Sequence, residues 1–468
     1  MNIDKNISKY IFRGYDIRGI YGKDLTEDVA FTIGKSYGTI LRKKYNRDKV
    51  IVGFDNRASS IMLANALMQG IVDTGVDVTF LGMVTTPMLY FASVIYKIPA
   101  AIMVTASHNP PEYNGFKMSF DEKGEICGDE IQEFRKFTAN CKFIGLLSKD
   151  LGKIEKVDIV SKYIDMLTSK FDFDKKKKVV IDCGNGTASL FVRDIFSKLK
   201  LKPIYICCES MPNYPNHQPD PAEAENMVML QEAVLKNKAD MGIAVDGDAD
   251  RVGIVDEKGQ ILPSDYYMAI ISKDILPNID VKKIIFDVNC SKTLVEEVKK
   301  AGGIPIYYRT GNSYIKRKMQ EDSILFGGEI SGHTFFKDKY YGFDDGLYAG
   351  LRMLELIINH KSKLSEEKDA LIKFYSTPVI KINVDDSIKA KIVEDVKKYC
   401  MGKKYNTITI DGARVEFDDG FAIVRMSNTT PKLTLRFEAT TQERLDQLKN
   451  EFVDLVNEKI KQYANVNS

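Results

Sequence analysis

Short hydrophobic runs alternate with stretches of helical periodicity through the first three-quarters of the chain. The first cycle of this pattern predicts strands at 50–55, 78–81 and 100–106, with a helix at 59–74 between the first two. Strands that alternate with helices are typical of α/β domains with mainly parallel sheets. We therefore expect the chain to begin with a domain of this kind.

The same pattern starts twice more. The predicted strands lie at 178–182, 204–208 and 241–245 in the second cycle and at 283–288, 304–308 and 324–327 in the third. Each cycle ends with a hydrophobic strand that opens into a polar loop, at 105–110, 246–251 and 328–333. The cycles share no residue-level identity, so they indicate a repeated architecture and not a solenoid.

After about residue 376 the pattern changes. Alternating runs at 379–384 and 407–410 predict antiparallel strands, and a helix is expected from 442 to about 462. The predicted fold class is α/β, with three similar mixed α/β domains and a C-terminal α+β domain. The predicted domains span residues 1–152, 153–258, 259–373 and 374–468.

Composition excludes several classes of function. The 468 residues carry 67 basic and 65 acidic side chains, a net charge of +2, which gives no support for binding to nucleic acid or membranes. The seven cysteines have no C-x-x-C spacing, which indicates reduced thiols. The N-terminus lacks the hydrophobic region of a signal peptide, and no stretch approaches a membrane span. We expect a soluble cytoplasmic protein.

The loop at 105–110 carries the first candidate catalytic group. Its strand would bring the Ser107 hydroxyl and the His108 imidazole to the carboxyl edge of the sheet, where open α/β sheets bind ligands. Two prolines then stop the strand, and Lys117 follows close enough in sequence to return positive charge to the hydroxyl. A Ser-His pair after a strand is by itself more often a turn with its hydrogen bonds satisfied, but the polar loops described below favour Ser107 as a nucleophile.

Three aspartates, Asp246, Asp248 and Asp250, stand at alternating positions directly after a predicted strand. Side chains two residues apart in extended backbone point the same way, so all three carboxylates can converge on one ion. Hard oxygen ligands suit Mg²⁺, which keeps coordination positions for phosphate. A haloacid-dehalogenase-like phosphatase with Asp246 as its nucleophile is an alternative, but it leaves Ser107 and Arg425 without roles.

Three other segments offer groups for a phosphorylated sugar. Glu329, Ser331 and His333 combine a carboxylate and a hydroxyl for sugar hydroxyls with an imidazole that exchanges protons near neutral pH. The loop at 425–431 offers a guanidinium, hydroxyls and an amide, which suit a phosphate. The segment at 13–19 holds two arginines and a tyrosine between glycines. Together these loops supply the groups that phosphoryl transfer requires.

In these motifs and their order the chain resembles the α-D-phosphohexomutases, most closely the phosphomannomutase/phosphoglucomutase branch, and the resemblance runs essentially end to end. It implies four domains around a central cleft, with one loop from each. The implied activity is that of an isomerase of carbohydrate metabolism, which moves a phosphoryl group between C1 and C6 of mannose or glucose phosphates. It proceeds through a phosphoserine enzyme and a bound 1,6-bisphosphate.

The resemblance also implies cofactors, partners and residue roles. Mg²⁺ is the implied cofactor, a hexose 1,6-bisphosphate the activator and intermediate, and small sugar phosphates the partners of a monomer or weak dimer. The implied metal ligands are Ser107 in its phosphorylated form, Asp246, Asp248 and Asp250. The implied catalytic residues are Ser107, Arg18, His108, Lys117, Arg251 and His333. The implied substrate-binding residues are Tyr15, Asn289, Thr310, Gly311, Asn312, Glu329, Ser331, His333, Arg425, Ser427, Asn428 and Thr429.

Three positions depart from the family pattern. Tyr266, Asn289 and Asn312 stand where members commonly have arginine, lysine and histidine, and we expect Lys292 and Arg309 to replace the missing charges. The departures leave open a preference for another substrate such as glucosamine phosphate, or a weakly active homologue that binds sugar phosphates.

Overall fold

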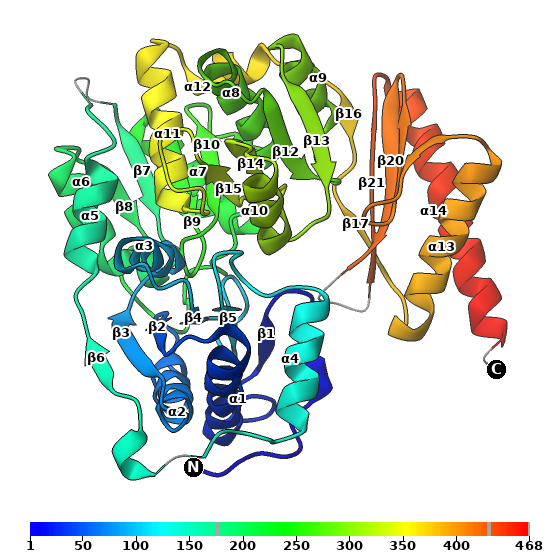
Figure 1. The fold of residues 1–468 in the computed structure, drawn as a ribbon. Coiled ribbons are helices and arrows are strands. Elements are labelled where there is room, and N and C mark those ends of the chain that lie inside the picture. The colour runs from blue at the N-terminus through cyan, green and yellow to red at the C-terminus, as the bar shows by residue number, and fades with distance from the viewer. Residues whose placement is uncertain (146, 174–176, 428–431, 467–468) are drawn as a thin grey trace.

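The computed structural model describes residues 1–145, 147–173, 177–427 and 432–466 of the chain. Within these residues the strands form four sheets that follow one another along the sequence (Figure 1). The first three sheets contain both parallel and antiparallel pairs, and the strand pairs of the fourth are antiparallel. The predicted fold class, three mixed α/β domains and a C-terminal α+β domain, is confirmed.

The first sheet forms as the hydrophobic pattern predicts. Its strands are β1 (Ile17–Ile20), β2 (Lys49–Phe54), β3 (Asp77–Met83), β4 (Ala101–Val104), β5 (Tyr113–Ser119) and β6 (Ile154–Lys156), in the order β1-β5-β4-β2-β3-β6. Its helices are α1 (Glu27–Tyr45), α2 (Ser60–Val72), α3 (Thr86–Tyr96) and α4 (Asp129–Ala139). Strand β2 is buried at every position except the first, as expected for a parallel strand with both faces covered. Because β6 pairs with β3, this sheet extends past the predicted boundary at residue 152.

The second and third sheets are smaller. The second has strands β7 (Val179–Asp182), β8 (Ile204–Ile206), β9 (Met241–Val245), β10 (Val252–Asp256) and β11 (Ile261–Leu262), in the order β11-β10-β9-β7-β8. The third has strands β12 (Lys283–Asp287), β13 (Ile304–Tyr308), β14 (Phe326–Gly328) and β15 (Thr334–Phe336), in the order β13-β12-β14-β15. The helices of this part of the chain are α5 (Val160–Thr168), α6 (Val192–Lys198), α7 (Val228–Asn237), α8 (Ser264–Ile275), α9 (Lys292–Lys300), α10 (Asn312–Glu321), α11 (Gly346–Asn359) and α12 (Leu364–Asp369).

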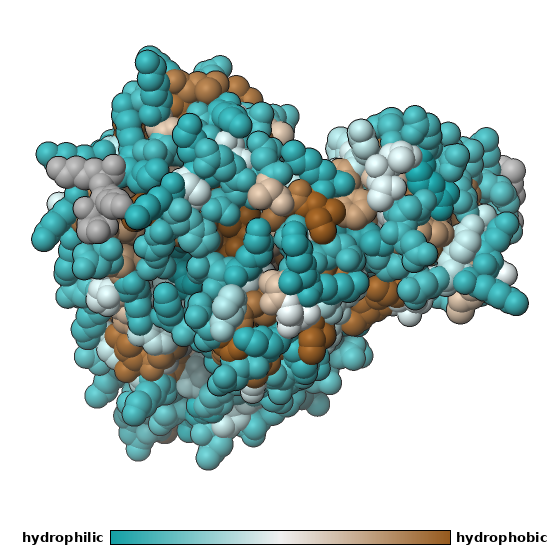
Figure 2. Space-filling view, turned by 90° about the horizontal axis from the view of Figure 1, so that it is seen from above, coloured by the Kyte–Doolittle hydropathy of each residue, from teal (hydrophilic) through white to brown (hydrophobic). Residues whose placement is uncertain are grey.

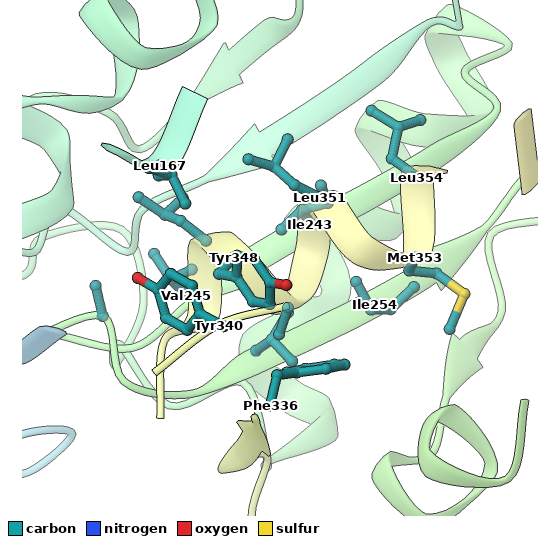
Figure 3. Close-up of a cluster of buried hydrophobic side chains, with 14 of the residues drawn as sticks. Leu167, Ile243, Val245, Ile254, Phe336, Tyr340, Tyr348, Leu351, Met353 and Leu354 are labelled. Carbon is teal, nitrogen blue, oxygen red and sulfur yellow. The ribbon is translucent and has the colours of Figure 1, made fainter. Parts of the chain in front are cut away.

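Helix α11 joins the second and third sheets into one hydrophobic core (Figure 3). It follows the third sheet in sequence, yet its Tyr348 and Leu351 pack in the same cluster as Ile243 and Val245 of β9. The approach is so close that a Cβ atom added at Gly350 would lie 2.6 Å from Ile243 Cγ2. Strand β9 leads directly into the loop with the three aspartates, so this shared core fixes the position of that loop.

The C-terminal domain packs beside the third sheet. Its elements are β16 (Tyr375–Ser376), β17 (Ile380–Asn383), α13 (Asp386–Gly402), β18 (Asn406–Ile408), β19 (Ala413–Phe417), β20 (Gly420–Met426), β21 (Lys432–Ala439) and α14 (Gln442–Val466). Val288 of the third domain contacts Phe421 and Ile423 of β20. The buried Arg414 donates hydrogen bonds to the carbonyl oxygens of Val288 (2.7 Å) and Cys290 (2.8 Å). This junction holds the fourth domain against the third.

The C-terminal domain projects from the rest of the molecule, and hydrophilic side chains cover most of the face shown in Figure 2. The hydrophobic residues visible on this face form small separate groups. Among the helices of the described residues, none combines the length and the hydrophobicity needed to cross a membrane.

Candidate active site

Ser107 lies in the loop after β4 with its backbone in the left-handed region, at φ 51°. The side chain is buried, and its hydroxyl donates a hydrogen bond to Asp246 Oδ2 at 2.8 Å. Nδ1 of His108 lies 3.2 Å from the hydroxyl oxygen of Ser107. Left-handed backbone costs a non-glycine residue about 1–3 kcal/mol, so other contacts must hold the loop in this shape.

Arg57 provides those contacts. It follows β2 and is almost fully buried, and its Nε donates to Asp55 Oδ2 at 3.1 Å. The two terminal nitrogens donate hydrogen bonds at 2.6–3.1 Å to the carbonyl oxygens of Ser107, Asn109, Pro110 and Tyr113. Sequence analysis missed this residue, although an Asp-x-Arg directly after a strand, at the same sheet edge as the serine, was an available signal.

The three aspartates of the second domain converge beside Ser107. All three side chains are fully buried, and their carboxylate oxygens lie within 4.8 Å of one another. Lys117 Nζ donates to Asp248 Oδ2 and to Asp250 Oδ2, each at 2.6 Å. The other oxygens of Asp248 and Asp250 accept no hydrogen bond from the described residues. Unpaired buried carboxylate oxygens fit a hard divalent cation such as Mg²⁺.

The charges of this cluster also favour a bound divalent cation. Burial and the neighbouring carboxylates raise the pKa of Asp246 well above its usual range, and they also raise the pKa of Asp250. Burial acts on Asp248 as well, but the ammonium group of Lys117 holds the pKa of that carboxyl below its usual range. Three buried carboxylates lie beside one ammonium group and the Arg251 guanidinium, whose Nε is 4.0 Å from Asp246 Oδ2, so negative charge exceeds positive charge and a divalent cation would balance it.

The serine loop and the aspartate loop touch through their backbones at Gly247. A Cβ atom at this position would lie 2.5 Å from the carbonyl oxygen of Ser107, which real Cβ atoms do not approach. Only glycine therefore allows the two loops their present separation. The hydrogen bond between Ser107 and Asp246 depends on that separation.

His333 lies between Arg251 and Asp344, whose positions favour one tautomer of the neutral imidazole. Arg251 Nε donates to His333 Nε2 at 3.0 Å, and a guanidinium can only donate, so Nε2 accepts. The proton of the neutral ring is therefore on Nδ1, which lies 2.8 Å from Asp344 Oδ2. Lys316 bridges Asp344 and Glu125 at 3.1 and 2.7 Å. Sequence analysis missed Asp344, Lys316 and Glu125, because they lie in segments without a recognisable motif.

The sugar-recognition residues meet at the edge of the third domain. Glu329 is buried and accepts a hydrogen bond from the backbone of Gly311, and Ser331 Oγ donates to Glu329 Oε2 at 3.3 Å. Burial raises the pKa of Glu329. A Cβ atom at Gly311 would lie 3.2 Å from the Tyr15 ring, so the N-terminal segment lies against this loop.

Arg425 ends in an ion pair with Asp411, at 3.0 Å. Asp411 also accepts a hydrogen bond from the backbone of Thr310, at 3.0 Å, so it connects the third and fourth domains. The backbone of Ser427 donates to the carbonyl oxygen of Lys432 at 2.9 Å. Asn428 and Thr429 lie outside the described residues.

A cleft of about 610 Å³ opens beside Ser107. Of the predicted site residues it is lined by Tyr15, Arg18, Ser107, His108, Lys117, Arg251, Asn312 and His333. Arg13 adds another positive charge, and Gln218 and Asp220 are lining residues that sequence analysis missed. The other predicted site residues that the structure describes are not among the lining residues: Asp246, Asp248, Asp250, Asn289, Thr310, Gly311, Glu329, Ser331, Arg425 and Ser427. Four carboxylates, Asp16, Glu125, Asp220 and Glu225, line the cleft beside its four cations. Arg18 and Arg251 each lie near one of them, but their guanidinium groups still offer the donors that suit a phosphorylated small molecule.

The expected charge substitutes lie elsewhere. Lys292 donates to the carbonyl oxygens of Phe417 and Asp418, so its charge serves the junction between the third and fourth domains. The Arg309 guanidinium lies over the Tyr314 ring, 4.9 Å from its centroid. The prediction that these two side chains replace missing charges in the cleft is therefore wrong in this structure, because each is already engaged by neighbours.

Asn289 and Asn312 differ in their surroundings. Asn289 donates hydrogen bonds to Asp287 Oδ2 at 2.5 Å and to Thr310 Oγ1 at 3.0 Å. At the third departing position, the hydroxyl of Tyr266 is a hydrogen-bond partner of Thr293 Oγ1 at 3.4 Å. Asn312 lines the cleft and donates to Asp344 Oδ2 at 3.2 Å. Of the three positions that depart from the family pattern, Asn312 is the one that faces the cleft.

A buried serine hydroxyl beside a carboxylate cluster, in a cleft lined by cations, defines a metal-dependent phosphoryl-transfer enzyme. Models of the four phosphoglucomutase/phosphomannomutase domains, three α/β/α domains and a C-terminal domain, match residues 9–143, 161–259, 263–375 and 379–455. The chain belongs to the phosphoglucomutase/phosphomannomutase family. This membership removes the haloacid-dehalogenase-like alternative.

Named relatives cover nearly the whole chain. It is 39% identical over 443 residues to phosphomannomutase/phosphoglucomutase of Pseudomonas aeruginosa, with 94% of each chain covered. It is 39% identical over 449 residues to phosphoglucomutase of Neisseria gonorrhoeae, with 96% of each covered. A solved phosphoglucomutase/phosphomannomutase family protein of Burkholderia thailandensis matches with a TM-score of 0.89 and 35% identity, covering 97% of this chain and 98% of that one.

We predict that Gly247→Ala lowers kcat/KM by at least about tenfold, equivalent to about 1.4 kcal/mol of transition-state stabilisation, because the added Cβ forces the serine and aspartate loops apart. Steady-state kinetics and thermal unfolding measure the effect. Gly402→Ala is the control, since a Cβ at that position meets no atom within 4 Å. Equal activity of the two variants would contradict the close approach of the loops.

We also predict that Arg57→Lys lowers activity by about tenfold or more, because an ammonium cannot form the five fixed hydrogen bonds of the guanidinium. Arg47→Lys is the control, since Arg47 forms an exposed pair with Glu122. Assays of both variants, with circular dichroism to verify folding, test the prediction. Wild-type activity in Arg57→Lys would show that the serine loop keeps its shape without this residue.

Proposed function

We propose that this chain interconverts the 1-phosphates and 6-phosphates of mannose and glucose through phosphorylated Ser107 and a bound hexose 1,6-bisphosphate. The observation that carries the proposal is the Ser107 hydroxyl, 2.8 Å from Asp246 in a cation-lined cleft. The names of the relatives, phosphomannomutase/phosphoglucomutase and phosphoglucomutase, support a hexose phosphate as the substrate.

In the first half-reaction the free hydroxyl of the bound hexose phosphate attacks the phosphorus on Ser107. The bond from phosphorus to the serine oxygen breaks, and a new bond to the sugar oxygen forms. The attacking hydroxyl must lose its proton. The His108 imidazole lies 3.2 Å from Ser107 Oγ, close enough to take this proton and to pass it to the serine oxygen that leaves the phosphorus.

Cations then stabilise the charge of the transferring group. Arg18, Lys117 and Arg251 line the cleft around Ser107. Such pre-positioned positive charges supply most of the catalysis in phosphoryl transfer. Asp246, Asp248 and Asp250, with an oxygen of the phosphorylated Ser107, would hold Mg²⁺, which would neutralise further negative charge on the phosphoryl group.

The bisphosphate must turn around in the cleft before its second phosphate returns to Ser107. Glu329 accepts hydrogen bonds from sugar hydroxyls in both orientations, while Arg425, Ser427, Asn428 and Thr429 bind the phosphate that is not being transferred. Hydrogen bonds to the O3 and O4 hydroxyls do not depend on the configuration at C2, the carbon at which glucose and mannose differ. The backbone of Gly311 donates a hydrogen bond to Glu329 and lies against the Tyr15 ring, and Thr310 precedes it in the same proposed substrate-binding segment.

Each proposed domain contributes one loop to this reaction, with boundaries near residues 152, 258 and 373. These groups all come from a single chain, which supports a monomer or weak dimer as the active form. Asn289 and Asn312 offer neutral amides where family members commonly have charges. A charge-assisted hydrogen bond is roughly twice as strong as a neutral one, so we expect a modest kcat/KM for both hexoses.

We predict that Ser107 is partly phosphorylated in the isolated protein and that Ser107→Ala lowers activity by several orders of magnitude, since the nucleophile is lost. Mass spectrometry before and after phosphatase treatment locates the phosphoryl group, and coupled assays with glucose, mannose and glucosamine 1-phosphates measure turnover. Ser272→Ala is the control, because it removes another buried hydroxyl, outside the cleft. A phosphoryl group on Asp246 or His108, or a wild-type lacking turnover with all three sugars, would overturn the assignment.

Mg²⁺ is expected to be required, and Asp248→Asn should weaken its apparent affinity by at least about tenfold, since one anionic ligand is lost from the cluster. Titration of activity with Mg²⁺ after removal of metal by a chelator measures this shift. Asp256→Asn is the control, because Asp256 is equally buried and pairs with Lys368 outside the cleft. Full activity of the wild-type protein in excess chelator would rule out the metal requirement.

A further inference from the structure

A second group of metal-ligating side chains lies at the end of β7, outside the cleft. Asp182 is the last residue of that strand, and Cys207 and His217 belong to the segment that follows β8. One ligand atom from each lies within 4.8 Å of the other two. His217 Nε2 is 3.1 and 3.3 Å from the two oxygens of Asp182. The proposed mutase reaction uses none of these three side chains.

Two of the three side chains are already oriented by their neighbours. His217 Nδ1 lies 2.9 Å from the carbonyl oxygen of Gln218, and Asp182 Oδ1 accepts a hydrogen bond from the backbone of Gly184 at 2.8 Å. An imidazole that donates one N–H to a carbonyl presents its other nitrogen as a lone pair, which is the usual arrangement of a histidine bound to a metal. The lone pair of Nε2 therefore points towards the Asp182 carboxylate, which is the direction needed for both side chains to bind one metal ion.

We propose that Asp182, Cys207 and His217 bind a divalent transition metal of the zinc class, with water as the fourth ligand. A thiolate, an imidazole and a carboxylate form a donor set that suits Zn²⁺ or Co²⁺, whereas Mg²⁺ prefers oxygen ligands alone. Tetrahedral Zn²⁺ with bonds near 2.0–2.1 Å separates nitrogen and oxygen ligands by roughly 3.3 Å, so the observed 3.1 Å contact needs to open only slightly.

The surroundings allow an ion to enter. Asp182 is buried, but the His217 side chain keeps 12% of its surface exposed, and Cys207 is partly exposed.

The neighbouring thiols provide an internal control. Cys208 follows Cys207 directly, but it is buried and its Sγ faces Cys183 Sγ at 3.2 Å. Neither of these two sulfur atoms belongs to the cluster with His217. The proposal thus distinguishes two adjacent cysteines, since Cys207 is a ligand and Cys208 is not.

A metal at this position would hold the segment that supports the serine loop. Gln218, which follows the histidine ligand, donates to the carbonyl oxygen of His108 at 2.6 Å. Asp220 lies 3.7 Å from Arg251. The ion would therefore stabilise the 207–220 segment and would take no part in phosphoryl transfer.

The test uses Co²⁺ in the presence of excess Mg²⁺, which occupies the oxygen ligands of the aspartate cluster. Bound to a thiolate, Co²⁺ gives a sulfur-to-metal charge-transfer absorption in the near ultraviolet that oxygen ligands cannot produce. We expect this absorption at one equivalent of Co²⁺ in the wild-type protein and in Cys208→Ser. We expect it to be lost in Cys207→Ser and strongly reduced in His217→Gln, with the far-ultraviolet circular dichroism of all variants unchanged.

Thermal unfolding gives a second measurement. In excess Mg²⁺, Zn²⁺ should raise the Tm of the wild-type protein and of Cys208→Ser, while Cys207→Ser should show no increase. Absence of the charge-transfer absorption in the wild-type protein would overturn the proposal, as would its persistence in Cys207→Ser. Mutase activity is a separate readout. In Mg²⁺ alone, without Zn²⁺ or Co²⁺, it should be the same in the wild-type protein and in Cys207→Ser, so failure of this proposal leaves the proposed reaction untouched.

Discussion

The organisation of the cleft depends on the burial of three carboxylates beside a single ammonium group. Such a cluster is unfavourable unless further positive charge approaches it, because buried charges lose their hydration. Lys117 supplies one charge from the first domain, while the aspartates come from the second. The same requirement therefore holds the two domains together and creates the place for a divalent cation and a phosphoryl group. Catalytic electrostatics and domain association share one physical cause.

The domains around the cleft are joined to one another in two different ways. Helix α11 ties the second and third sheets into one core, so the aspartate loop and the Glu329 loop are fixed relative to each other. The fourth domain is attached differently, mainly through polar contacts of Arg414, Arg436, Lys292 and Asp411, with a small hydrophobic contact at Val288. A polar junction of this kind separates more easily than a hydrophobic core. The proposed reaction would use such a difference, because a bisphosphate that turns around must leave its contacts with the fourth domain while the serine and its neighbours keep their places.

Much of this arrangement could be predicted from local patterns. Several features of the site are encoded by a few consecutive residues each: the polar loops after hydrophobic strands, the alternating aspartates and the spacing of Glu329 and His333. The predicted strands of the first cycle also form. What could not be predicted depends on contacts between distant segments. Arg57 and Asp344 carry no motif, and their roles appear only when the fold brings them to Ser107 and His333. Lys292 shows the opposite error. It was predicted to replace a missing charge in the cleft because it lies close to Asn289 in sequence. Helix α9 instead directs its ammonium group to the fourth domain.

Asp411 has a consequence for the energetics of substrate capture. Its carboxylate pairs with Arg425 and accepts a hydrogen bond from the backbone of Thr310. A phosphate that binds Arg425 has to displace this resident anion, so the free energy gained is the difference between two ionic contacts and not the full strength of one. A monovalent anion gains little in that exchange, whereas a doubly charged phosphate ester gains more. If Arg425 binds the phosphate as proposed, Asp411 competes with it for the guanidinium and favours ligands of higher negative charge.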